Sequence, residues 1–228
     1  MEQNKIVQDG QRWATISSQR HFANAHVEVV TDQVQTPGRS QPRPWTIVHR
    51  KAAVVIAPMT DDGKIVLVCQ ERIPIREAIW EMPSGQIDAV AGTSLSAAAV
   101  YPADAASKAG SAKADDLGQA VETIEQVALR ELREEAGYEL AREGELIPLG
   151  HYFTSPGFTD ERGHFFLARP VETVPNYIRN ESESILDCRP FTIFEICRMI
   201  TQNEIRDANT LSCLARLWAR DLLPGGTV

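Results

Sequence analysis

The sequence of 228 residues has no run of 18 apolar residues, so no membrane-spanning helix is expected. Residues 1–5 are polar and lack the apolar core of a secretion signal, which favours a cytoplasmic protein. The four cysteines form no Cys-x-x-Cys pair, and the five histidines show no metal-ligand spacing. Serine and cysteine nucleophile motifs are also missing. We therefore expect neither a zinc site, nor a disulfide framework, nor a membrane anchor.

Positive charge is in short supply, with 23 basic against 31 acidic residues and a formal net charge of -8. A net-acidic protein is a poor non-specific binder of nucleic acid. It can still bind a phosphate-bearing ligand if a metal ion or a basic cluster reverses the local field. Hydrophobic residues make up 43% of the chain, which is ordinary for a globular protein of one domain with extensions.

The order of expected elements is strands, a helix, strands and two helices, which indicates a mixed α/β fold of the α+β type. Residues 36–44 are rich in proline and read as a loop, and Asp61-Asp62-Gly63 is typical of a hairpin turn. Apolar and β-branched runs predict the strands. These strands are 26–30, 45–49, 52–57, 64–69, 146–153, 163–168 and 184–188.

Residues 89–118 differ from the rest, because Ala, Ser and Gly fill 18 of these 30 positions and no apolar period persists. We interpret this stretch as an inserted flexible loop. A helix is predicted from about residue 119 to 136, with Gly137 as its C-terminal stop. Two more helices are expected near 193–201 and 208–222.

Three carboxylates near the C-terminal end of the predicted helix at 119–136 lie on adjoining parts of one face: Glu131, Glu134 and Glu135. Like charges at this spacing destabilise a helix by roughly 0.2–0.5 kcal/mol per pair. A divalent cation would remove this repulsion, and Mg2+ prefers such oxygen ligands. The charge pattern alone nevertheless favours an ordinary solvated helix, with Arg130 and Arg133 interleaved for balance.

The residue order reverses that preference, because 130–138 reads Arg-Glu-Leu-Arg-Glu-Glu-Ala-Gly-Tyr. This segment resembles the C-terminal half of the Nudix box: Arg-Glu, an aliphatic residue, any residue, Glu-Glu, any residue, Gly and an apolar residue. Glu122 stands eight residues before Arg130, where the box has its upstream glutamate. The resemblance implies that Arg130 pairs with a box carboxylate. It also implies metal ligands, namely Glu131, Glu134 and Glu135, with Glu122 in support and Glu134 also counted as catalytic.

The first half of the box is displaced. Its glycine is expected at position 116, which is Asp, whereas residues 80–88, Trp-Glu-Met-Pro-Ser-Gly-Gln-Ile-Asp, resemble the box entry of ADP-ribose pyrophosphatases. Between Gly85 and Glu122 lie 36 residues where the motif has five, so the box contains an insertion of 31 residues. A surface loop of that size costs little in closure entropy. The resemblance adds the Ser84 carbonyl as a metal ligand and Gly85 as a substrate-site residue.

Residues 150–161 resemble the Ser-Pro-Gly loop of the same subfamily, which implies that Pro156 lies at the substrate site, and residues 204–211 resemble its closing helices. The general base of such enzymes often comes from a loop outside the box. One candidate is Glu161, which follows the Ser-Pro-Gly turn. The other is the pair Glu181 and Glu183, in an acidic loop before the last expected strand. The sequence leaves both alternatives open.

Two further residues are candidates for contact with substrate. Arg72 resembles the arginine of the family's Gln-x-Arg, at a strand end where a guanidinium can clamp a phosphate; a surface arginine is the alternative. Trp45 is a candidate to stack on adenine, although a role in the core or in a dimer interface is favoured.

The resemblance implies a Nudix α/β/α sandwich with a mixed β-sheet. Residues 1–44 would form an N-terminal β extension with dimerisation strands, and 45–222 the Nudix domain with the 89–118 insertion. The expected activity is Mg2+-dependent hydrolysis, with Mn2+ as the alternative metal and about two or three ions, of ADP-ribose to AMP and ribose 5-phosphate. Another nucleotide sugar or a dinucleotide is an alternative substrate, and a non-catalytic nucleotide sensor is the alternative class. A homodimer is expected, without nucleic acid or membrane as partner.

Overall fold

The computed structural model describes residues 13–87, 122–179 and 184–225. The predicted insertion at 89–118 and the candidate bases Glu181 and Glu183 lie outside these ranges. Among the described residues, no helix is long and apolar enough to cross a membrane. The cytoplasmic location stays a prediction.

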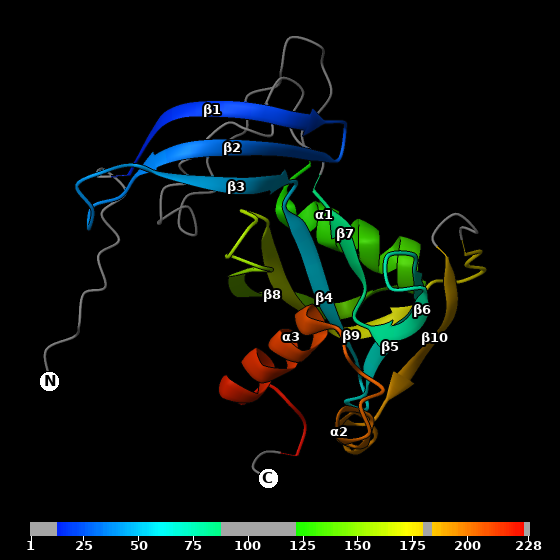
Figure 1. The fold of residues 1–228 in the computed structure, drawn as a ribbon. Helices are drawn as coiled ribbons and strands as arrows, with labels where there is room; N and C mark the ends of the chain where they lie inside the picture. The colour runs from blue at the N-terminus through cyan, green and yellow to red at the C-terminus, as the bar shows by residue number, and fades with distance from the viewer. Residues whose placement is uncertain (1–12, 88–121, 180–183, 226–228) are drawn as a thin grey trace, which may run out of the picture.

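Two β-sheets organise the described chain (Figure 1). The N-terminal sheet is antiparallel, in the order β1 (Ala14–Ala23), β2 (Val27–Gln35) and β3 (Arg43–Arg50). The second sheet has seven strands, five of them in the order β10-β5-β4-β9-β8, while β6 pairs with β5 and β7 pairs with β4. Its strands are β4 (Ala53–Thr60), β5 (Ile65–Arg72), β6 (Glu77–Glu81), β7 (Ser84–Gln86), β8 (Tyr138–Phe153), β9 (Arg162–Thr173) and β10 (Ile185–Phe191).

The second sheet is mixed, because β4 and β9 run parallel whereas the other strand pairs are antiparallel. Each strand expected from the apolar runs is present, and the turn at Asp61-Asp62-Gly63 joins β4 to β5 with Gly63 at φ 78°. Three strands were not expected. β1 is exposed at all ten positions and mostly polar, and β6 and β7 have only five and three residues, too short for a visible period.

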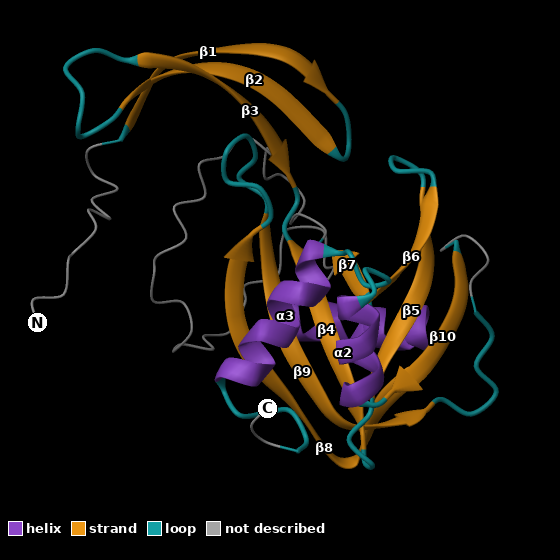
Figure 2. Ribbon diagram, turned by 60° about the horizontal axis from the view of Figure 1, so that its bottom comes forward, coloured by secondary structure: helices purple, strands orange, loops and turns teal. Residues whose placement is uncertain are grey.

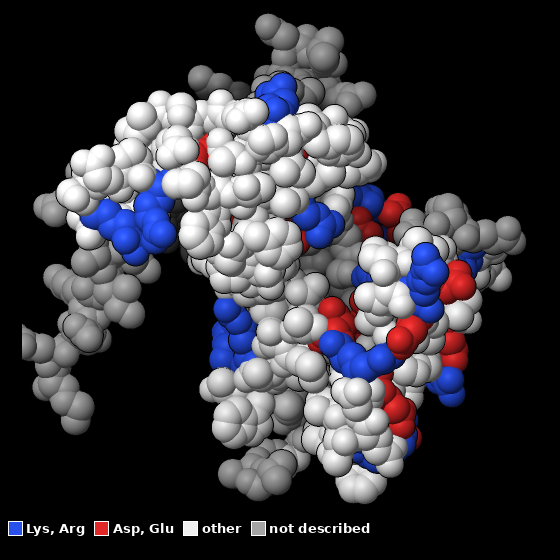
Figure 3. Space-filling model, in the orientation of Figure 1, with Lys and Arg blue, Asp and Glu red and all other residues white. Residues whose placement is uncertain are grey.

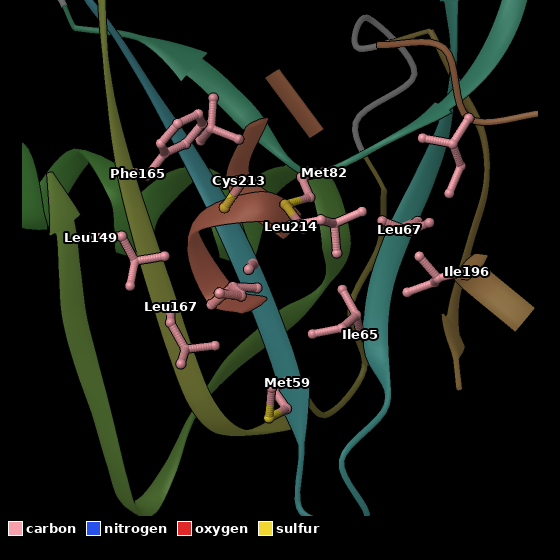
Figure 4. Close-up of a cluster of buried hydrophobic side chains, with 14 of the residues drawn as sticks. Met59, Ile65, Leu67, Met82, Leu149, Phe165, Leu167, Ile196, Cys213 and Leu214 are labelled. Atoms are coloured by element: carbon pink, nitrogen blue, oxygen red, sulfur yellow. The ribbon is translucent and has the colours of Figure 1, made fainter. Parts of the chain in front are cut away.

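Alternation along β4 and β5 places the sheet between two helical layers (Figure 2). Val54 and Ile56 face the helix α1 (Ile124–Glu131), whereas Val55 and Ala57 face α2 (Ile193–Thr201) and α3 (Ala208–Ala219). Figure 4 shows the second of these cores, in which side chains of β4, β5 and β9 meet those of the C-terminal helices. Two covered faces explain why these central strands are apolar at consecutive positions. The predicted mixed α+β fold is therefore confirmed.

The acidic helix begins later than expected. Thr123 caps α1 in a capping box with Gln126, so the helix starts at Ile124, and Glu122 precedes it. It continues as η3 (Leu132–Ala136), a π-helical turn, and stops at Gly137, which has φ 70° as predicted for this position. The helix predicted over 193–201 is confirmed, and the last helix ends at Ala219 rather than at residue 222.

Candidate active site

The box entry and the acidic helix meet although 31 residues of insertion separate them in sequence. β7 pairs with β4, and this pairing carries Ser84 and Gly85 to the side of the helix. The backbone N–H of Ser84 donates a 2.7 Å hydrogen bond to Oε2 of Glu135. A Cβ added to Gly85 would lie 2.0 Å from Cδ of Glu131, so the absent side chain leaves the space that this carboxylate fills. The displaced glycine of the motif therefore lies against a carboxylate of the acidic helix.

Arg130 gathers three carboxylates of the box. Its Nη1 lies 2.8 Å from Oε1 of Glu131 and 2.9 Å from Oε2 of Glu134, and its Nε donates to Oε2 of Glu122 at 3.2 Å. Partial burial opposes the charge of Arg130, but these carboxylates outweigh it and raise its pKa above the ordinary value. The expected pairing of Arg130 with a box carboxylate is thus present. The same arginine contacts Glu122, whose supporting role at a metal site stays a prediction.

Two of the box carboxylates are buried: Glu131 is 8% exposed and Glu135 is 3% exposed. A buried carboxylate must be compensated by hydrogen bonds or positive charge. The described residues contain no group of three His, Cys, Asp or Glu placed to hold a metal ion. Glu131 contacts Arg130, and Glu135 accepts a hydrogen bond from the Ser84 N–H. The carboxylate oxygens of Glu131 and Glu135 nevertheless suit a hard divalent cation. The space beside Gly85, which has no side chain, accommodates the Glu131 carboxylate.

Arg72, expected to clamp a phosphate, is held by a carboxylate of the protein itself. Its Nε and Nη2 donate to the two carboxylate oxygens of Glu81 at 2.8 and 2.9 Å, a bidentate pair. Burial works against the charge of Arg72, but Glu81 and the nearby Glu135 and Asp207 raise its pKa. The guanidinium keeps 40% side-chain exposure beside the box, so one edge is engaged while the residue still reaches solvent.

The N-terminal end of α3 contacts β6 and the residue that follows it, next to Arg72 and Glu81. Asp207 caps α3 by accepting from the Thr210 N–H, and the Thr210 hydroxyl in turn accepts from the Met82 N–H at 2.9 Å, next to Glu81. Arg206 forms an ion pair with Glu77 of β6. Figure 3 shows charged side chains gathered over β5, β6 and β10, whereas the face presented by the N-terminal sheet is mainly uncharged.

Glu161, one candidate general base, is 7% exposed and lies just before β9. Arg50 Nη1 and the Thr154 hydroxyl both donate to its Oε2, at 3.1 and 2.9 Å. Its own N–H donates to the Thr159 hydroxyl. Sequence reasoning missed Arg50 and Thr154, and no local signal could have found Arg50, since it stands 111 residues before its partner.

Two other predicted substrate residues, Pro156 and Trp45, are exposed to solvent. Pro156 is exposed in the turn that follows β8, and Trp45 is 49% exposed on β3. The Trp45 indole N–H donates to the Gly157 carbonyl at 2.9 Å, so it binds the Ser-Pro-Gly loop. Trp45 therefore does not belong to the core, and an adenine-stacking role stays a prediction.

Tyr152 was not anticipated either. Its ring stacks on Phe165 at 4.1 Å between centroids, and its buried hydroxyl has no hydrogen-bond partner in the described part of the chain. Burial, followed by the charges of Asp207 and Glu161, raises its pKa above the ordinary value.

Replacing Tyr152 by phenylalanine should leave the free energy of unfolding unchanged or raise it, because no protein hydrogen bond is lost. Urea unfolding measures this change. Tyr177→Phe is the matched control, since the Tyr177 hydroxyl donates to the Glu134 carbonyl and its removal should cost about 1 kcal/mol. An equal loss in Tyr152→Phe would mean that its hydroxyl has a partner in the folded protein.

Comparison with known proteins agrees with this geometry. The NUDIX domain family matches residues 116–212. The ADP-ribose pyrophosphatase of Bacillus subtilis (strain 168) is 26% identical, over 92% of this chain and 94% of that protein. The methanol dehydrogenase activator of Bacillus methanolicus is 28% identical over the same shares. The ADP-ribose pyrophosphatase of Mycobacterium tuberculosis is 28% identical over 84% of this chain and 76% of its own length.

A solved structure described as an ADP compounds hydrolase has the same fold, with a TM-score of 0.66 and 14% identity over 93% of this chain and 98% of that chain. The matched segment includes the acidic helix, α2 and the start of α3, and the relatives extend the likeness over most of the chain. Residues 116–212 therefore match the NUDIX domain family, and most of the chain is similar to ADP-ribose pyrophosphatases. Together these similarities support a Nudix hydrolase that acts on phosphoanhydrides.

Proposed function

We propose that the protein hydrolyses the diphosphate linkage of ADP-ribose to AMP and ribose 5-phosphate. The observation that carries this proposal is the contact of the buried carboxylates Glu131 and Glu135 with the Ser84–Gly85 backbone. Metal-binding carboxylates and a close backbone approach are what a site for a charged diphosphate requires.

Mg2+ is the proposed metal, with Mn2+ as the alternative and about two or three ions in total. Glu131, Glu134, Glu135 and the Ser84 carbonyl would hold it, with Glu122 in support. When bound, such ions neutralise phosphate oxygens and make a bound water more acidic. The positive charge of Arg130 compensates the negative charge of the carboxylates that contact it. Because Gly85 has no side chain, the Glu131 carboxylate can occupy the space beside it.

The remaining roles fall to residues around the box. Arg72 is positioned by Glu81 and is proposed to face a phosphate with the part of its guanidinium that Glu81 leaves exposed. Glu161 is proposed as the base that takes a proton from the attacking water, with Glu181 and Glu183 as the alternative. Pro156 and Trp45 would border the nucleoside through the Ser-Pro-Gly loop.

Two relatives named ADP-ribose pyrophosphatase support this substrate. The alternative substrates are another nucleoside diphosphate sugar or a dinucleotide, which contain the same phosphoanhydride. A non-catalytic nucleotide sensor is disfavoured because the box retains its carboxylates Glu131, Glu134 and Glu135.

The substrate class is tested by incubating the protein and Mg2+ with equal concentrations of ADP-ribose, other nucleotide sugars and dinucleotides. Phosphate released after phosphatase treatment gives kcat/KM for each compound. The expected result is the highest kcat/KM on ADP-ribose. A higher value on another compound would move the assignment to that substrate, and tight nucleotide binding without any turnover would favour the sensor.

A homodimer is proposed through the N-terminal sheet. β1 is exposed along its whole length and carries Ile16 and Phe22, which are 62% and 53% exposed. Exposed apolar side chains on one strand are typical of an interaction surface. The expected division into 1–44 and 45–222 also remains a proposal, and it falls inside β3.

A further inference from the structure

We propose that β3 of the N-terminal sheet supplies a positioning residue for the reaction: Arg50, together with Thr154, fixes one carboxylate oxygen of Glu161 and leaves the other to act. This inference rests on the proposed function. Both hydrogen bonds end on the same atom, because Arg50 Nη1 lies 3.1 Å and Thr154 Oγ1 2.9 Å from Oε2. Among the described residues no bond is made to Oε1, and this atom is not sealed from solvent.

A carboxylate held in this way has two unequal oxygens. The anchored oxygen is already engaged by a cation and a hydroxyl, so its lone pairs are less available to another donor. The remaining oxygen keeps its capacity to accept a hydrogen bond from a water or a substrate hydroxyl. Because Glu161 is 7% exposed, its side chain also has little room to rotate and exchange the two oxygens. The geometry therefore assigns Oε1 as the oxygen that meets the reacting water.

The loop that bears Glu161 runs beside residues 45–50 of β3. The Trp45 indole donates to the Gly157 carbonyl at 2.9 Å, and the Val48 N–H donates to the Phe158 carbonyl at 2.8 Å. His49 Nδ1 lies 2.6 Å from Oδ2 of Asp160. With the Arg50 contact, residues 45–50 of β3 make a link to each of residues 157, 158, 160 and 161. Displacing β3 would therefore displace Glu161.

β4 carries this loop to the same end of the sheet as the box. Ala53, three residues after Arg50, pairs with Gly163 of β9 on one side and with Gln86 of β7 on the other. Neighbouring strands lie about 4.8 Å apart, which places Gln86, the last residue of β7, within roughly 10 Å of Gly163 across β4. Glu161 precedes Gly163 by two residues, on the loop that Arg50 contacts. Arg50 thus acts next to β4, the strand that pairs with both the box entry and β9.

The proposal is tested with Arg50→Ala, Arg50→Lys and Thr154→Val, each in the wild-type and in the Glu161→Gln background, by measuring kcat and KM on ADP-ribose. Arg50→Ala should lower kcat between about 10- and 100-fold with KM little changed, because a misplaced group costs rate. Arg50→Lys should recover part of this loss. In the Glu161→Gln background none of the three changes should lower kcat further, since they act through that carboxylate.

Arg43→Ala is the control, since Arg43 is an exposed arginine at the other end of β3, and kcat should stay unchanged. Thr154→Val keeps the test valid if Arg50→Ala does not fold. An equal kcat loss from Arg50→Ala in both backgrounds would overturn the positioning role, as would a rise in KM alone or an unchanged kcat in Glu161→Gln. Those results require an active wild-type protein, whereas an inactive wild-type protein would overturn the proposed function and this role together.

Discussion

Replacing Glu135 by glutamine is expected to lower kcat on ADP-ribose by about a hundredfold or more, with little change in the free energy of unfolding. Glutamine keeps the size of the side chain and an amide oxygen that can accept the 2.7 Å hydrogen bond from the Ser84 N–H. The substitution removes the negative charge of Glu135, which a divalent cation would need. Glu135 is only 3% exposed. Steady-state kinetics at saturating Mg2+, together with urea unfolding, measure both quantities.

Glu125→Gln is the matched control for that change. Glu125 lies in the first turn of α1 and is exposed, so the same loss of charge on the same helix should leave kcat unchanged. Unchanged turnover in Glu135→Gln would show that the metal site is assigned to the wrong carboxylates. A collapse of the fold in Glu135→Gln would instead indicate that the Glu135 charge is structural.

Replacing Gly85 by alanine is expected to lower the affinity for Mg2+ and to reduce kcat/KM by about 10- to 100-fold. The added Cβ would lie 2.0 to 2.4 Å from the carboxylate atoms of Glu131, so that carboxylate must leave its place. The atoms that give way are the end of a flexible side chain, so the stability loss should stay within the roughly 1–3 kcal/mol of local overpacking. A titration of Mg2+ against initial rate, with thermal unfolding alongside, measures these effects.

Gly38→Ala serves as its control, because a Cβ at Gly38 meets nothing within 4 Å and the residue lies in the loop between β2 and β3. It should leave the affinity for Mg2+ and kcat/KM unchanged. If Gly85→Ala binds Mg2+ as the wild type does, the close approach of Gly85 to Glu131 has no part in the metal site.

The central strands of the fold could be predicted from sequence because two covered faces demand apolar residues at consecutive positions, as in β4 and β5. β1 could not, because all its residues are exposed and most of them are polar. The acidic helix was expected too early, since the capping box of Thr123 and Gln126 outweighs the apolar pattern that continues upstream. Its end was predicted correctly, because Gly137 meets the need for a positive φ.

The site divides in the same way. Glu131, Glu134, Glu135 and Gly85 follow from residue order, even across the insertion, because the motif fixes their spacing on each side of it. The hydrogen-bond partners of Arg72 and Glu161 do not follow from residue order. Arg72 pairs with Glu81 through the antiparallel pairing of β5 with β6, and Arg50 reaches Glu161 only after β3 meets a loop 111 residues away. Contacts of this kind depend on strand pairing, which no local pattern specifies.

The most direct test of the central claim is the fate of ADP-ribose with chelator-treated protein before and after Mg2+ is added back. Chromatography of the products should reveal AMP and ribose 5-phosphate in equal amounts once Mg2+ is present, and intact ADP-ribose without it. Cleavage of ADP-ribose that continues at the same rate in the chelator would contradict a reaction that depends on metal held by Glu131, Glu134 and Glu135. Intact ADP-ribose after Mg2+ addition would contradict the proposed activity itself.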